Sequence, residues 1–384
     1  MRFRHADGTI VHVAYCTNVH QAEDLQGVLD QLARFGEPVR ERLNADRLGL
    51  GLWLARPVAT ELIADPQALR RLRTELSARG LEVVTLNGFP YQGFHAPVVK
   101  HAVYHPDWTR PDRARYTVDL ARLLAALLPD DAARGSVSTL PLGWREPWTT
   151  VHHDQARTQL DLLAIDLAKI ADETGRPVRV GFEPEPGCTV ENTGQAITHL
   201  KDVDTDWLGI CLDTCHLAVA FEEPAQALGA LAVAGLPVVK TQASCALHAE
   251  HPRDPATRYA LQTFVEPRFL HQTREGLPYG ADDLDIALSG GLPGHAPWRV
   301  HFHAPLHADP RPPLTTTRPV LQATLKELFG GSTAWTDHVE VETYTWQVLP
   351  NAPQGDRGLV EGLAAELDWV RGELTGLGLT EVRG

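Results

Sequence analysis

The chain has 384 residues and a formal net charge of −14. A phosphate-backbone binder usually carries a basic face, so this charge indicates that nucleic acid is not a partner. The hydrophobic fraction of 43% is typical of a soluble globular protein. A chain of this length can bury a large core without disulfides or structural metals.

The five cysteines, at positions 16, 188, 211, 215 and 245, form no CxxC pair and indicate neither a disulfide framework nor a zinc finger. The N-terminal stretch lacks the apolar region of a signal peptide. No run approaches the ~18 apolar residues of a membrane span. We therefore expect a cytoplasmic protein with no direct membrane insertion.

Short β-rich runs alternate with longer helical runs along the chain. The expected strands are 11–20, 48–55, 81–90, 135–144, 178–187, 207–216, 236–245 and 338–346. The expected helices are 21–34, 65–80, one from about 111, 150–175, 316–329 and about 356–374. This alternation predicts parallel strands joined by crossover helices.

About eight such units in one chain favour an α/β fold of the closed (β/α)8 TIM barrel type over an open sheet. No GxGxxG follows the first strand and no GxxxxGK[ST] occurs, so the sequence lacks the signatures of a dinucleotide fold or a P-loop. We expect a single domain over 1–384. The Pro-, Gly-, His- and Asp-rich segment 246–297 is too long for an ordinary loop. We interpret it as an insertion after the seventh strand that covers the C-terminal face of the barrel, ahead of a further β-rich run at 298–307.

In a TIM barrel the chemistry takes place at the C-terminal ends of the strands. The polar residues expected at these ends are Asn18, His20, Asn87, Glu183, Glu185, Asp213, His216, Gln242, Ser244, His301, His303, His307, Glu340 and Glu342. A Glu, an Asp, a His and a Glu from successive strand ends form a mixed oxygen and nitrogen set that suits Mn, Mg, Co or Zn. A bound cation would also offset the cost of burying several carboxylates together.

Two choices within this set stay open. Residues two apart on a strand share a face, so Glu183 competes with Glu185 and Glu340 competes with Glu342. We favour Glu342 because it lies nearer the C-terminal end of its strand. Each motif alone also has an ordinary explanation, since the alternation in VEVET is typical of a half-exposed strand. The order of the motifs and their shared position at strand ends carry the prediction.

The motifs GFEPEPG, CLDTCH, HFH and VEVETYTW, in this order, resemble the xylose isomerase-like TIM barrel superfamily. That superfamily includes sugar isomerases, ketose 3-epimerases, inosose-type isomerases and dehydratases, and the endonuclease IV group. More narrowly, the chain resembles the EboE-like metabolite traffic proteins of secondary-metabolite clusters. The stretches that carry this resemblance span nearly the whole chain and include AYCTNVHQAED, TLNGFPYQGFH, KTQASCALH and VETYTWQVLP.

The resemblance to the epimerase branch implies one divalent metal ion held by Glu183, Asp213, His303 and Glu342. There the two glutamates also serve as the acid–base pair, and His216 touches the substrate. In the endonuclease branch the same Asp-xx-His pair and further histidines hold three zincs. This chain departs from that branch because Gln242 stands where a histidine is expected. The long insertion before HFH also separates it from both patterns.

Our leading hypothesis is metal-assisted isomerisation or epimerisation of a small polyhydroxylated metabolite, a sugar or a cyclitol. The expected substrate-binding residues are Asn18, His20, Asn87, Glu185, His216, Gln242 and His301. Other proteins of the same metabolite pathway are candidate partners. One alternative is zinc-dependent hydrolysis of a phosphate ester or nucleic acid, which the many histidines favour and the net charge opposes. The other is a non-catalytic carrier that binds a metabolite at the barrel mouth.

Overall fold

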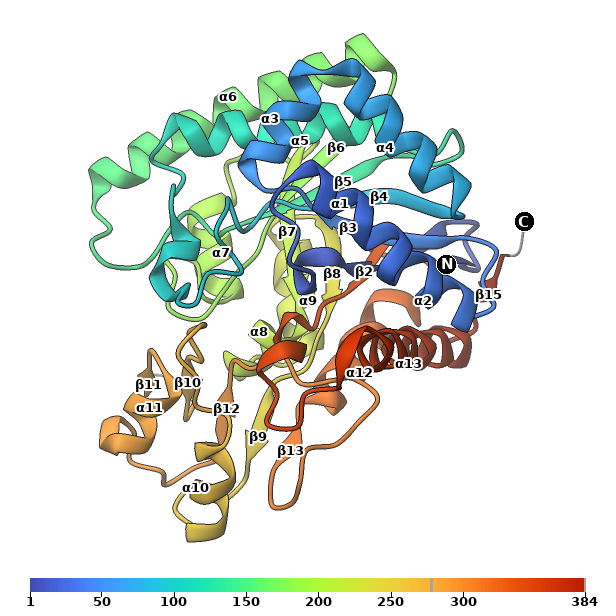
Figure 1. The fold of residues 1–384 in the computed structure, drawn as a ribbon. Coiled ribbons are helices and arrows are strands. Elements are labelled where there is room, and N and C mark those ends of the chain that lie inside the picture. Colours follow the sequence, from blue (N-terminus) through green and yellow to red (C-terminus); the bar gives the residue numbers. More distant parts are fainter. Residues whose placement is uncertain (277–278, 383–384) are drawn as a thin grey trace.

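Eight parallel strands close into a barrel in the computed structural model, which describes residues 1–276 and 279–382 (Figure 1). The barrel strands in order are β2 (Ile10–Cys16), β3 (Leu48–Trp53), β4 (Leu81–Asn87), β5 (Gly135–Thr139), β6 (Val178–Phe182), β7 (Leu208–Asp213), β8 (Val238–Ala243) and β14 (His338–Val341). The last strand pairs in parallel with the first, with Val339 opposite Val13. The predicted (β/α)8 barrel is confirmed.

Helices surround the barrel and bury their apolar faces against it. They are α1 (Leu25–Gln31), α2 (Glu37–Arg42), α3 (Arg56–Ala64), α4 (Pro66–Ala78), α5 (Pro111–Leu127), α6 (Thr150–Thr174), α7 (Thr193–Leu200), α8 (Thr214–Val219), α9 (Pro224–Val233), α12 (Arg318–Phe329) and α13 (Gly355–Gly376). In α6 the buried face includes Leu160, Leu163, Leu167 and Ile170, as the helical spacing predicts. None of the helices in the described residues is long and apolar enough to cross a membrane.

The chain between β8 and α12 builds a second, smaller sheet, which we call the insertion sheet (Figure 1). Its five antiparallel strands are β9 (Leu247–Ala249), β10 (Thr273–Arg274), β11 (Gly280–Ala281), β12 (Trp298–Val300) and β13 (Thr315–Thr316). Helices α10 (Pro255–Gln262) and α11 (Leu284–Ile286) accompany it. Leu284, Trp298 and Phe302 belong to an apolar cluster of the insertion that is separate from the core of the barrel.

Two stretches differ from the sequence-based expectation. The run 298–307 is a strand only over Trp298–Val300, where it pairs within the insertion sheet instead of joining the barrel. From His301 the chain leaves that sheet and turns toward the barrel, so its histidines become available to the site. The expected helix 21–34 is interrupted, because a π-helical turn at Leu32–Gly36 follows α1 and leads into α2.

A buried ion pair lies inside the barrel, below the C-terminal ends of the strands. Lys240 on β8 and Glu340 on β14 are both fully buried, and their Nζ and Oε2 atoms are 2.6 Å apart. Gly51 on β3 makes room for this pair, since a Cβ there would lie 1.5 Å from the Glu340 carboxylate. Glu340 is therefore used in an ion pair inside the barrel, while Glu342 lies two residues further toward the mouth of the barrel.

Removing one member of the Lys240–Glu340 pair should destabilise the barrel strongly. Lys240→Met leaves a buried carboxylate without its cation, which typically costs about 3–5 kcal/mol, whereas replacing both charges by apolar groups is often neutral. We expect urea denaturation of Lys240→Met to show this loss and the double variant Lys240→Met/Glu340→Leu to recover most of it. A double variant no more stable than Lys240→Met would contradict the pairing.

Candidate functional site

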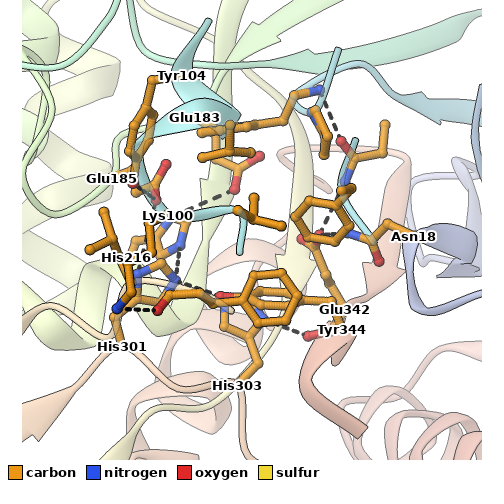
Figure 2. Close-up of a pocket in the computed structure, with 18 residues that line it drawn as sticks. Asn18, Lys100, Tyr104, Glu183, Glu185, His216, His301, His303, Glu342 and Tyr344 are labelled. Atoms are coloured by element: carbon orange, nitrogen blue, oxygen red, sulfur yellow. Dashed lines mark hydrogen bonds and ion pairs between the residues drawn. The ribbon is translucent and has the colours of Figure 1, made fainter. Parts of the chain in front are cut away.

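Three carboxylates meet where β6, β7 and β14 end. Glu183 follows β6, Asp213 is the last residue of β7 and Glu342 follows β14. One oxygen of each lies within 4.8 Å of the oxygens of the other two. Figure 2 shows Glu183 and Glu342 directed into a shared cavity. The parallel register of the strands brings these residues together although up to 159 positions (183 to 342) separate them in sequence.

Asp213 is fixed by its neighbours in CLDTCH and on β8. Its Oδ1 accepts hydrogen bonds from the backbone N–H of His216 at 2.9 Å and from Ser244 Oγ at 2.8 Å. The first bond makes Asp213 the N-cap of α8, which explains the sharp change from strand to helix. Its Oδ2 has no hydrogen-bond partner within residues 1–276 and 279–382. That oxygen remains free to bind a cation.

Glu342 is held by two amides. Asn18 and Asn87 donate from Nδ2 to its Oε1 at 2.7 and 3.1 Å. Burial, followed by the nearby charges of Glu340 and Asp213, raises the pKa of Glu342 well above its usual range. Burial and the charges of Glu342 and Asp213 do the same to the pKa of Glu183. A cation between these groups would favour their ionised forms.

His303 joins the carboxylates from the chain that follows the insertion sheet. Its Nδ1 is 2.8 Å from the backbone oxygen of Glu342, which can only accept, so Nδ1 carries the hydrogen. Nε2 therefore keeps its lone pair, and it lies 4.0 Å from Asp213 Oδ2. Burial lowers the pKa of His303, which keeps the ring neutral and able to act as a ligand.

The four residues expected to hold a metal ion share one property. Each has a buried polar atom that makes no hydrogen bond to any described residue, and these atoms are Glu183 Oε2, Asp213 Oδ2, His303 Nε2 and Glu342 Oε2. Glu183, Asp213 and Glu342 form one candidate ligand group, and His303 joins it through Asp213. Buried polar atoms in proteins are nearly always paired, so four unpaired atoms in two adjoining groups need an explanation. Three carboxylate oxygens and one imidazole nitrogen form a donor set that fits a divalent cation.

A second cluster adjoins the first. Glu185, His216 and His301 each offer one atom within 4.8 Å of the others, and the Nε2 atoms of the two histidines are 3.0 Å apart. Burial lowers the pKa of His216 to about 4. Burial also raises the pKa of Glu185 to about 8, although the hydrogen bond from Tyr104 acts in the opposite direction. Both glutamates of GFEPEPG thus point inward, but toward different neighbours.

Gln272 connects this second cluster to the insertion sheet. Its Nε2 donates to the Tyr104 hydroxyl at 3.0 Å, and Tyr104 in turn donates to Glu185 Oε1 at 2.7 Å. Its Oε1 lies 2.7 Å from His301 Nδ1. Gln272 directly precedes β10, which pairs with β12, so the sheet sets the position of both Gln272 and His301.

Of the expected substrate-binding residues, Asn18, Asn87, Glu185, His216 and His301 line the cavity. His20 and Gln242 are not among the lining residues. His20 stacks on Phe35 with ring centroids 4.2 Å apart and contacts the Tyr15 hydroxyl. Gln242 accepts from Cys211 Sγ at 3.2 Å, and its amide nitrogen lies 3.5 Å from Glu340 Oε2. Roles in substrate binding stay predictions for all seven residues.

A roof of loop residues closes over the strand ends. It is formed by Phe89, Phe94 and Val99 from the chain between β4 and α5, and by Phe269 and Leu270 from the insertion. The cavity below has about 520 Å³ of empty volume, including the part open to solvent. Sequence reasoning did not single out Tyr104, Gln272, Lys100 or Tyr344 as part of the site. Tyr104, Gln272 and Lys100 lie in loops or short segments without a strand pattern. Tyr344 lies in the run 338–346, which the sequence predicts to be a strand, but it begins a 3₁₀ segment after β14.

Comparison with known proteins supports the fold. The family model described as "Xylose isomerase-like TIM barrel" matches residues 52–253. No curated protein sequence matches the chain. Among solved structures, a xylose isomerase-like TIM barrel protein from Mycobacterium smegmatis in complex with magnesium superposes with a TM-score of 0.53 at 14% identity, covering 96% of this chain and 97% of that one.

Two further solved structures have the same architecture. An L-ribulose 3-epimerase superposes with a TM-score of 0.51 at 13% identity, with 96% of each chain covered. A putative sugar phosphate isomerase/epimerase from Anabaena variabilis gives a TM-score of 0.50 at 16% identity, covering 96% of this chain and 99% of that one. At these identities the likeness concerns the fold.

The choice between Glu183 and Glu185 as metal ligand can be tested directly. Glu183→Gln removes a carboxylate oxygen from the group that Glu183 forms with Asp213 and Glu342. Glu185→Gln instead changes the neighbouring group of Glu185, His216 and His301. We expect Glu183→Gln to weaken binding of Mn²⁺ or Mg²⁺ by at least about 100-fold, beyond the range seen for residues that only support a ligand. Glu185→Gln serves as the matched control and should stay within about tenfold. Calorimetric titration of the metal-free protein measures both, and the reverse ranking would assign the metal to Glu185.

The buried carboxyl of Glu366 on α13 should make stability depend on pH. It accepts hydrogen bonds from Thr343 Oγ1, the Leu306 amide and Trp346 Nε1, and thereby ties α13 to the chain segments that carry Glu342 and His303. Burial raises its pKa to about 7. From about pH 4.5 to 7 the unfolded state loses this proton while the folded state keeps it. The free energy of unfolding therefore falls as pH rises, by up to about 3 kcal/mol.

The Glu366→Gln variant removes this contribution while keeping a neutral side chain of the same shape. We expect its stability relative to wild type to increase between pH 5 and pH 8, because the wild type alone loses stability through this group. Urea denaturation at several pH values measures the difference, in which other titrating groups cancel. A difference that is constant over this range would show that Glu366 keeps an ordinary pKa.

Proposed function

Because the chain belongs to the xylose isomerase-like TIM barrel family, we propose that it is a metal-dependent isomerase or epimerase acting on a sugar or cyclitol. The observation that carries this proposal is the carboxylate group of Glu183, Asp213 and Glu342, which His303 joins through Asp213. Each of the four has an unpartnered buried atom within the described residues. A single Mn, Mg, Co or Zn ion held by these four would complete their coordination.

The bound ion would polarise a substrate carbonyl and acidify the adjacent C–H bond. Glu183 and Glu342 are the groups proposed to remove and return that proton, one from each face of the substrate carbon. Both carboxylates line the cavity, where a general acid–base pair has to reach the substrate. Asn18 and Asn87 orient Glu342 through its Oε1 and leave Oε2 for chemistry or for the metal.

The second cluster supports the proposal by supplying groups for substrate hydroxyls. Glu185, His216 and His301 face the same cavity as Glu342 and lie at its insertion side (Figure 2). We also propose that the insertion is the cover of the C-terminal face, since Phe269 and Leu270 help to line the cavity. The narrower proposal of a role in an Ebo-type secondary-metabolite cluster, with other proteins of that pathway as partners, rests on the sequence stretches quoted above.

One observation favours a second candidate function. Histidines 216, 301 and 303 occur in further groups that can hold a metal ion, including one with Cys215. Two or three zinc ions bound here would support a hydrolase of phosphate esters of the endonuclease IV type. A protein that binds no metal would instead be a metabolite carrier.

Metal content and proton exchange together test the proposed function. We expect the wild type to retain about one equivalent of a divalent ion by elemental analysis, and Asp213→Asn to lose it while keeping the hydrogen-bond acceptor that caps α8. An exposed change on α6, Asp154→Asn, is the control. Metal-loaded wild type should incorporate deuterium from solvent into a ketose or inosose next to the carbonyl. Glu342→Gln should lower that rate by about 10²–10⁴-fold. Two or three zincs, or no metal after soaking, would overturn the single-metal isomerase.

A further inference from the structure

The charge of the cavity restricts which ligands it can bind. Glu183, Glu185 and Glu342 line it, and Asp213 lies with them at the strand ends. Among the lining residues that the structure describes, Lys100 is the one lysine or arginine. Its ammonium group is paired with Asp283 and also donates to the Phe269 backbone oxygen at 3.2 Å. Four carboxyl groups and one divalent cation leave no positive charge for a phosphate or carboxylate substituent.

Three backbone amides of the roof are already engaged in hydrogen bonds. The amides of Val99 and Lys100 both donate to the Arg268 oxygen, at 2.7 and 2.9 Å. The Phe89 amide donates to Asn87 Oδ1 at 3.0 Å. These N–H groups are therefore already used where the roof meets the cavity. A phosphate placed there would lose its hydration without gaining donors in exchange, which is costly.

The roof is instead apolar. Phe89, Phe94, Val103, Phe269 and Leu270 all line the cavity. Phe94 packs edge-to-face on Tyr344 and close to Phe269, so these aromatic side chains form one continuous wall. The polar groups at the strand ends thus suit hydroxyl and carbonyl groups, and the roof suits hydrocarbon.

We propose that the substrate is an uncharged polyhydroxylated carbonyl compound whose end remote from the carboxylates is apolar, not a sugar phosphate or a sugar acid. This inference rests on the proposed function and specifies its substrate class. Hydroxyl and carbonyl oxygens occupy the end formed by Glu183, Glu342 and the histidines. An alkyl or aryl substituent packs against the roof.

Three matched probes test this on the metal-loaded full chain by calorimetric titration: D-fructose, D-fructose 6-phosphate and 6-O-benzyl-D-fructose. We expect the phosphate ester to bind at least tenfold more weakly than fructose and the benzyl ether at least tenfold more tightly. A phosphate ester that binds as well as fructose or better overturns the absence of an anion site. A benzyl ether that binds no better than fructose overturns the apolar end.

A charge variant tests the role assigned to Lys100. Asp283→Asn keeps the Oδ1 acceptor for the amides of His271 and Leu284 but removes the charge that neutralises Lys100. We expect this variant to bind fructose 6-phosphate at least tenfold more tightly than wild type does, with the affinity for the benzyl ether changed less than threefold. Unchanged binding of the phosphate ester would contradict the charge argument.

The results with these probes distinguish an error in the substrate class from an error in the isomerase function. If fructose or its phosphate binds and exchanges its C–H proton while the ranking is reversed, the isomerase function stands and the substrate class is wrong. If none of the three probes binds to protein shown to carry metal, both are wrong. A ranking as expected together with metal-dependent exchange supports both.

Discussion

The burial of four carboxylates at one end of a closed barrel is the constraint on which the rest of the site depends. Glu183, Glu185, Asp213 and Glu342 are each at most 5% exposed, and like charges this close cannot all ionise without compensation. In each carboxylate one oxygen accepts hydrogen bonds from the protein or lies near a histidine. The other oxygen has no hydrogen-bond partner in the described chain. Hydrogen bonds orient the group but do not neutralise it. A divalent cation is the simplest species that satisfies both the charge and the unpaired atoms.

The insertion sheet takes part in building this site. β10 and β12 pair so that Gln272 and His301 lie side by side, and the chain then continues through His303 to the backbone of Glu342. Thr345 donates to the His303 oxygen, and Glu366 holds the segments on both sides. Carboxylates from the barrel and imidazoles from the insertion therefore assemble only when α13, the loop after β14 and the insertion are docked together.

The sequence predicted the barrel and its carboxylates because both follow from periodic features. Parallel strands have their C-terminal ends at one rim, so Glu183, Asp213 and Glu342 had to meet there. Gln242 pairs in register with Glu340, two residues before Glu342, and its amide nitrogen contacts Glu340 instead of lining the cavity. His20 turns away after a short 3₁₀ segment that strand periodicity does not describe. Tyr104, Gln272 and Lys100 lie in loops, whose paths depend on tertiary contacts that no local pattern encodes.

The polar part of the site is built by residues at the strand ends of the barrel, whereas the apolar roof is built by loop residues. Residues at strand ends are fixed by backbone pairing across the whole barrel, so altering one disturbs its neighbours. The roof depends on a few contacts, chiefly the pairing of Val99 and Lys100 with the Arg268 oxygen and the link from Lys100 to Asp283. The remote end of the substrate proposed above would pack against Phe94 and Phe269 of this roof. Selectivity for that end can therefore change through loop residues alone, while the groups that would bind the metal and move the proton stay on the barrel.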